Sequence, residues 1–244
     1  MSHLTSTAST APGRVTGTGV GVPGYAHPLV APEEWAGLAR PGAPLHWAVL
    51  NVADGPGTRL DPRCLQAATR LRTAGVRILG HLPTTDTATA AHTAHRYLDW
   101  YGVDGFYLDR CPADRAALPG IGRTITALRA LRDDAHIVLG HDSHPHPGYA
   151  DHADQLVTYR GPWSDYRWSQ VAEWTADHPP ERFCHFVHGV PRGHLEEALR
   201  IARWQGAATI YFTDRTPHAG TSPWETVPGY WDEFVSRVGT GVSE

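Results

Sequence analysis

Short apolar runs alternate with longer amphipathic stretches along the chain, from about residue 20 to residue 238. This alternation predicts β-strand–α-helix units and a parallel sheet. Eight runs have the character of buried strands, at residues 20–25, 46–51, 76–81, 105–109, 136–140, 155–159, 182–187 and 208–213. Barrels of eight such units need about 250 residues, close to the 244 of this chain. The pattern therefore predicts a single-domain α/β protein, a (β/α)₈ TIM barrel over residues 19–240.

Helical spacing of apolar residues fills most of the gaps between these runs. Residues 62–73 are expected to form a helix, with Asp61 as its N-cap and Gly75 ending it. Further helices are expected at residues 32–38, 88–100, 121–131, 168–176, 192–204 and 224–238. The first helix is short and the segment after the fifth strand is mostly loop, so an open seven-stranded sheet is the alternative. A Rossmann sheet is disfavoured because no G-x-G-x-x-G follows the first run.

The N-terminal segment and the length of the apolar runs indicate where in the cell the protein is expected. Residues 1–18 are rich in Ser, Thr, Gly and Pro and lack the apolar centre of a signal peptide, so we expect a disordered lead-in. No apolar run approaches the length of a membrane span. We therefore expect a cytoplasmic protein with no membrane partner, and the oligomeric state stays open.

Composition narrows the chemistry. The net charge is −4 and no basic stripe is present, so nucleic acid is not an expected partner. All 21 basic residues are arginines, which excludes Schiff-base, pyridoxal-phosphate and P-loop mechanisms that need a lysine. The three cysteines are widely spaced and form no C-x-x-C pair, which favours neither a disulfide framework nor a zinc–thiolate site. We expect no cofactor.

Polar or aromatic residues stand at or just after the end of almost every predicted strand. They are Tyr25, His27, Asn51, His81, Asp109, Arg110, His141, Asp142, Tyr159, Arg160, His188 and Asp214. In a barrel these strand ends converge on one rim, where the active sites of this fold lie. The pattern predicts a polar, sugar-type active site whose partner is a small molecule or a saccharide.

Several of these residues could carry chemistry. Asp109 can act as base, nucleophile or charge stabiliser, and the alternative is that it caps a turn. Asp214 has the same position after the last strand, or pairs with a neighbouring arginine. The stretch from His141 to His152 is rich in metal-ligand residues, but its spacing matches no helical zinc motif, so we expect no metal site.

Several motifs, in the right order, resemble the spherulation-specific family 4 (spherulin 4-like) proteins, glycoside hydrolase family 135. Residues 22–28 are similar to the opening strand of that family, 50–57 to its Asn-Pro-x-Ser-Gly-Pro-Gly turn, 80–84 to its Gly-Tyr-Val-x-Thr stretch, and 100–109 to its Gly-x-Asp-Gly strand. Residues 211–214, 222–224 and 227–231 resemble its closing segment. The resemblance implies a (β/α)₈ barrel and an activity like that of endo-α-1,4-galactosaminidases, which requires two carboxylates.

Two arginines replace glutamates of the family pattern. The family has Asp-Glu after the fourth strand, where this chain has Asp109-Arg110, and a glutamate after the sixth, where this chain has Arg160. Because arginine holds carboxylates and phosphates in a bidentate fork, we expect an anionic substrate.

Three functions follow from these residues. The first is a hydrolase or lyase of specialised metabolism on a glycosidase-like barrel, repurposed for an anionic small molecule or sugar derivative. In it Asp109 would be acid, base or nucleophile, Arg110 and Arg160 would clamp the anion, His188 or His141 would move a proton, and Asp214 would orient. The substrate would be contacted by Tyr25, His27, Asn51, His81, Asp142 and Tyr159.

The second function is that of a glycoside hydrolase with rearranged carboxylates, Asp109 with Asp142 or Asp214. The third is a non-catalytic carbohydrate-binding protein.

Overall fold

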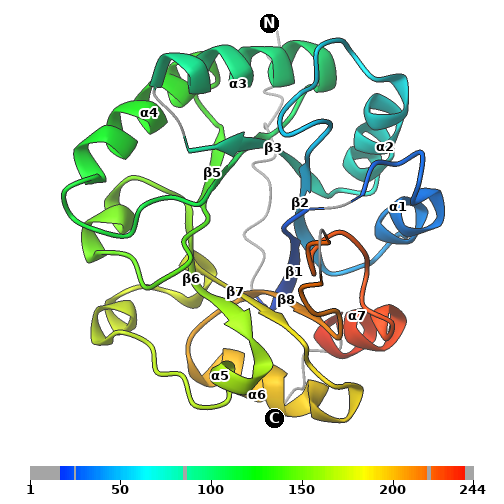
Figure 1. Cartoon of the computed structure of the whole chain (residues 1–244), viewed down its shortest axis with the longest axis vertical. Helices are drawn as coiled ribbons and strands as arrows, with labels where there is room; N and C mark the ends of the chain where they lie inside the picture. The colour runs from blue at the N-terminus through cyan, green and yellow to red at the C-terminus, as the bar shows by residue number, and fades with distance from the viewer. Residues whose placement is uncertain (1–16, 25, 85–86, 219–220, 240–244) are drawn as a thin grey trace, which may run out of the picture.

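Eight parallel strands close into a barrel in which each strand pairs with the next along the chain, and β8 pairs with β1 (Figure 1). The computed structural model describes residues 17–24, 26–84, 87–218 and 221–239. The strands are β1 (Gly19–Val22), β2 (Leu45–Leu50), β3 (Arg77–Pro83), β4 (Gly105–Asp109), β5 (His136–Leu139), β6 (Gln155–Pro162), β7 (Phe183–His188) and β8 (Thr209–Thr213). The TIM barrel and all eight strands are confirmed, with ends that differ by a few residues.

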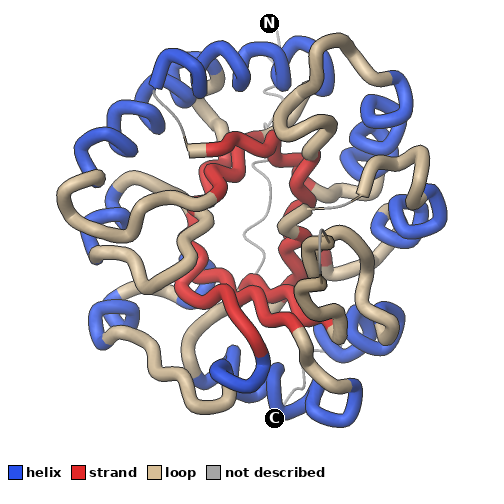
Figure 2. Tube along the Cα trace, viewed as in Figure 1, coloured by secondary structure: helices blue, strands red, loops and turns tan. Residues whose placement is uncertain are grey.

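Helices form an outer ring around the strands (Figure 2). The α-helices are α1 (Pro32–Leu38), α2 (Pro62–Thr73), α3 (Thr87–Tyr101), α4 (Leu118–Leu131), α5 (Trp163–Tyr166), α6 (Leu195–Trp204) and α7 (Trp231–Gly239). Single 3₁₀ turns occur at Pro147–Asp151, Glu173–Asp177, Pro180–Arg182 and Arg192–His194. Asp61 caps α2 as predicted, because its Oδ1 accepts hydrogen bonds from the amides of Arg63 and Cys64 at 2.8 and 3.0 Å.

Two of the predicted helices are wrong: one is absent and the other begins later in the chain. Residues 168–176 form no α-helix: α5 ends at Tyr166, and only the last residues of the range belong to a 3₁₀ turn. The last helix begins at Trp231 and not at residue 224, because Pro228 and Gly229 interrupt the helical spacing. Residues 222–230 are instead a loop after β8. The expected lead-in, residues 1–18, lies almost wholly outside the described residues.

Large side chains fill the barrel interior, so the barrel is a packed core and not a pore. The rings of Trp47, Tyr107 and Phe186 contact one another across it, with centroids 6.0 to 6.5 Å apart. Gly105 lets β4 approach β5 closely, since a Cβ there would lie 2.0 Å from the carbonyl oxygen of His136.

None of the helices in the described part of the chain has both the length and the apolar character needed to cross a bilayer.

Candidate active site

A polar cavity of about 540 Å³ opens at the carboxyl ends of the strands. Its wall is made by residues from the carboxyl-terminal ends of β3, β4 and β6 and from the loops after β1, β2, β3, β4 and β8. The lining residues are Pro23, Gly24, Ala26, His27, Asn51, Val52, Asp54, His81, Pro83, Thr84, Asp109, Arg110, Arg160, Ser222, Trp224 and Glu225. Six of the predicted site residues, His27, Asn51, His81, Asp109, Arg110 and Arg160, therefore share one cavity.

Asp109 is the most constrained carboxylate of this cavity. Its Oδ1 accepts a hydrogen bond from Nη1 of Arg160 at 2.8 Å, and its Oδ2 lies 3.6 Å from Nε2 of His81. The three side chains are mostly buried, with 14%, 18% and 10% of their surfaces exposed. Burial by itself would raise the pKa of Asp109, but His81 and the charge of Arg160 outweigh it and hold that pKa well below its usual range. Asp109 is therefore ionised at any physiological pH.

The backbone beside Asp109 holds an unusual conformation. Arg110 has a φ of 52°, in the left-handed region, which costs an arginine about 1 kcal/mol. Neighbouring contacts support it: the amide of Thr84 donates to the carbonyl oxygen of Asp109 at 3.3 Å, and the amide of Cys111 donates to that of Gly140 at 2.8 Å. The turn sends the side chain of Arg110 to the mouth of the cavity, where 79% of it is exposed and its Nε lies 3.6 Å from Oδ2 of Asp109.

Two further predicted contact residues already have partners within the protein. Oδ1 of Asn51 accepts the amide of Gly55 at 3.0 Å, which fixes the turn after β2. Asp142 lies outside the cavity wall and is 67% exposed, but its Oδ1 lies 3.4 Å from Nη1 of Arg160. Arg160 thus contacts two carboxylates at once.

Other predicted site residues lie outside this cavity wall. Tyr159 donates to the carbonyl oxygen of Pro162 at 2.9 Å, and the amide of Gly229 donates to Oδ1 of Asp214 at 2.9 Å. His141 is buried, with its Nδ1 3.0 Å from the carbonyl oxygen of Cys111. His188 packs against the ring of Trp224, with centroids 5.8 Å apart. Tyr25 lies outside the described residues.

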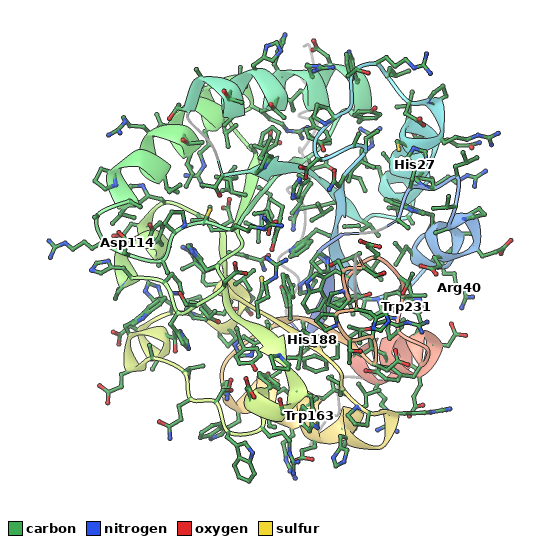
Figure 3. All side chains as sticks on the ribbon, viewed as in Figure 1. His27, Arg40, Asp114, Trp163, His188 and Trp231 are labelled. Carbon is green, nitrogen blue, oxygen red and sulfur yellow. The ribbon has the colours of Figure 1, made fainter. Side chains whose placement is uncertain are left out.

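His27, Asp61 and Cys64 are the group within the described residues whose ligand atoms are close enough for a metal ion. Nε2 of His27 lies 3.3 Å from both Oδ2 of Asp61 and Sγ of Cys64. However, Nδ1 of His27 accepts the amide proton of Leu29 at 3.1 Å, so a neutral ring carries its proton on Nε2. A metal-ligating histidine normally donates from its second nitrogen. The contacts therefore indicate a histidine that ties the loop after β1 to the start of α2; Figure 3 shows His27 beside α2.

Trp224 and Glu225 also line the cavity, although the sequence pattern did not predict them as site residues. They belong to the loop after β8, which the helical spacing had placed in the last helix. The ring of Trp224 is 8% exposed and lies 5.9 Å from the guanidinium carbon of Arg160. Glu225 is held beside it, because its carbonyl oxygen accepts the amide of Ala26 at 2.9 Å.

Fold and cavity together define a TIM barrel of the glycoside-hydrolase-like kind. The sequence model of spherulation-specific family 4 matches residues 19–238, and the chain belongs to this family, as the motifs predicted. The chain is 22% identical over 232 residues to Spherulin-4 of Physarum polycephalum, covering 89% of this chain and 69% of that protein.

Solved structures share the barrel. Aspergillus clavatus Sph3, solved in complex with GalNAc, superposes with a TM-score of 0.79 at 22% identity, over 92% of this chain and 98% of that chain. The exo-beta-1,4-mannosidase Op5Man5 from Opitutaceae bacterium strain TAV5 superposes with a TM-score of 0.57 at 11% identity, over 92% of this chain and 60% of that chain. At these identities the structural likeness shows the fold.

Proposed function

We propose that this protein hydrolyses a glycosidic bond of a saccharide bound in the cavity after the strands, with Asp109 as the carboxylate that faces the sugar. The observation that carries the proposal is that Arg160 and His81 contact the carboxylate of Asp109 at the wall of a polar cavity, an arrangement that lowers the pKa of Asp109. Glycosidic cleavage develops positive charge at the anomeric carbon, and a carboxylate that stays ionised can attack or stabilise that centre. Family membership and the GalNAc complex of Sph3 support an amino sugar as the first substrate to test.

The charges of the cavity favour a saccharide over a simple anion. Three carboxyl groups (Asp54, Asp109 and Glu225) line it beside two guanidinium groups (Arg110 and Arg160). Arg160, which the sequence analysis assigned to an anion clamp, already contacts Asp109 and Asp142. A free anion would have to displace one of these carboxylates. The cavity is therefore suited to a neutral or weakly basic polyol.

Turnover of defined oligosaccharides tests this proposal. Purified protein is incubated with α-1,4-linked oligosaccharides of galactosamine and N-acetylgalactosamine, and the products are followed by mass spectrometry. We expect cleavage by the wild type and a loss of at least about 100-fold in Asp109→Asn, which removes the charge and keeps the shape. Asp133→Asn is the matched control, because Asp133 is exposed and lies just before β5, at the opposite end of the barrel.

Each outcome of this experiment decides between the functions considered. Cleavage that survives Asp109→Asn would contradict the role of Asp109. Wild-type binding without cleavage, seen by calorimetry with the same oligosaccharides, would replace the proposal by a carbohydrate-binding protein with no activity.

An acidic sugar derivative is the second candidate, and the exposed side chain of Arg110 favours it. Its guanidinium lines the mouth of the cavity, and its one ion-pair neighbour among the described residues is Asp109, at 3.6 Å. A carboxylate on the substrate can reach it without disturbing Arg160. If this candidate holds, galacturonate raises the melting temperature more than galactose does, and Arg110→Gln abolishes the difference. Equal shifts with both sugars would exclude it.

A further inference from the structure

Hydrolysis of a glycosidic bond needs a proton donor as well as Asp109. The leaving oxygen must be protonated as its bond to the anomeric carbon breaks, and a second carboxyl group normally does this. Asp109 cannot do so, because His81 and Arg160 keep it ionised. Arginines occupy positions 110 and 160, so neither offers a titrating proton. The donor must come from elsewhere on the cavity wall.

Glu225 is a half-buried carboxyl group on that wall. Its Oε1 accepts the amide of Ser222 at 3.1 Å, and its carbonyl oxygen accepts the amide of Ala26 at 2.9 Å. The first bond fixes the side chain within the loop after β8, and the second holds this loop against the loop after β1. Within the described residues Oε2 has no hydrogen-bond or ion-pair partner, so one oxygen is left for a ligand in the cavity.

The position of Glu225 relative to Asp109 follows from its neighbour. The ring of Trp224 lies 5.9 Å from the guanidinium carbon of Arg160, and Arg160 is bonded to Asp109. Glu225 therefore comes directly after a residue that lies close to Arg160, the partner of Asp109, and all four residues line one cavity. Asp109 ends β4 and Glu225 lies in the loop after β8, so a sugar in the cavity can be contacted by both.

The other carboxyl groups near the rim are less suited. Asp54 is exposed in the turn after β2, where its φ of 52° places it in the left-handed region. Asp142 is 67% exposed and close to Arg160. Asp214 lies outside the cavity wall and accepts the amide of Gly229.

We propose that Glu225 is the acid/base residue of the reaction. This inference rests on the proposed function. The proton of the Glu225 carboxyl group passes to the glycosidic oxygen as the C1–O bond breaks, and the bonding electrons leave with that oxygen. The Asp109 carboxylate forms the new bond to C1. A water then attacks C1 and gives its proton to Glu225. The bond between C1 and Asp109 breaks in the same step and its electrons return to the Asp109 carboxylate, so both groups are restored.

Leaving-group dependence tests the role of Glu225. Glu225→Gln keeps an acceptor for the amide of Ser222, so the loop has its contacts in the variant. Its kcat on the oligosaccharide is expected to fall by about 100- to 10,000-fold, the usual contribution of general acid catalysis. On an N-acetylgalactosaminide with a dinitrophenolate leaving group, which needs no proton to depart, formation of the glycosyl–enzyme is expected to stay near the wild-type rate. Azide, acting as an external nucleophile, is expected to restore turnover of the dinitrophenyl substrate by Glu225→Ala.

Comparison with other variants separates this inference from the proposed function. Asp109→Asn is expected to lose activity on both substrates, and Asp133→Asn, at the opposite end of the barrel, is expected to retain both activities. An active wild type with an equally active Glu225→Gln overturns the role of Glu225 and leaves the proposed function in place. The same holds if Glu225→Gln loses both substrates to the same extent, since that is the pattern of a structural defect. A wild type that cleaves neither substrate overturns both proposals.

Discussion

Nη1 of Arg160 lies 2.8 Å from Oδ1 of Asp109, and Arg160 stands where the motif resemblance implies a glutamate. Two carboxylates so close together would share a proton, and one of them would be kept neutral. The arginine has the opposite effect, because it favours the ionised form of Asp109. If the protein hydrolyses glycosides as proposed, its proton donor is therefore expected outside this pair.

Removing Arg160 is expected to change both the ionisation of Asp109 and the stability of the fold. In Arg160→Ala the pKa of Asp109 rises, and the free energy of unfolding falls by about 2 kcal/mol because a mostly buried carboxylate loses its partner. Carboxyl carbon NMR and urea unfolding measure the two effects. Arg129→Ala is the control, since its pair with Asp154 is more than one third exposed and is worth less than about 1 kcal/mol. Equal losses in the two variants would contradict the prediction.

The strands were predictable because their side chains are buried on both faces of the sheet. A strand such as His136–Leu139, inside the barrel wall, has to be apolar almost throughout, and the run is visible in the sequence. The absence of an α-helix at residues 168–176 was not predictable in the same way. The aromatic residues of this segment pack individually: Trp174 lies against Phe183, with ring centroids 5.6 Å apart, while Trp168 is 78% exposed.

The site was partly predictable from strand ends. Asp109 and His81 were found because a polar residue ends an apolar run. Successive residues of a strand point to opposite sides, so only one of two neighbours faces the cavity. Arg160 faces it, whereas Tyr159 packs against Tyr166, with ring centroids 4.6 Å apart. Glu225 had no such signal, because it reaches the cavity through the folding of a loop.

The cysteine thiols are expected to be unreactive in the native protein. Cys64, Cys111 and Cys184 are buried free cysteines. Burial raises the pKa of both Cys64 and Cys111 to about 12, and raises that of Cys184 further. Since the thiolate is the reactive form, labelling by a disulfide reagent near neutral pH should be at least about 1,000-fold slower than for an exposed thiol. All three should react in denaturant. Rapid labelling of one thiol in the native state would show that its surroundings open.

Gly105 is expected to tolerate no side chain. A Cβ there would lie 2.0 Å from the carbonyl oxygen and 2.6 Å from the amide nitrogen of His136, and both are backbone atoms of β5 that cannot move without breaking the β4–β5 pairing. Gly105→Ala should cost about 3 kcal/mol in urea unfolding. At Gly193 a Cβ would meet no atom within 4 Å, so Gly193→Ala should change stability by less than about 1 kcal/mol. A stable Gly105→Ala protein would contradict the close approach of the two strands.

Stability is expected to fall as the pH drops below 6.5, because the fold holds buried histidines neutral. Burial lowers the pKa of His185 to about 3, and Nδ1 of its ring lies 2.8 Å from the hydroxyl of Tyr166. Burial also lowers the pKa of His46 and His141 to about 4. Between pH 6.5 and these values the unfolded chain binds protons that the folded chain does not, so the free energy of unfolding decreases as the pH falls.

In His185→Gln the slope of the free energy of unfolding against pH should be shallower by up to about 1.4 kcal/mol per pH unit, whereas the exposed His92→Gln should leave this slope unchanged. Urea unfolding over this pH range measures both slopes, and identical slopes in the two variants would mean that His185 is protonated in the fold.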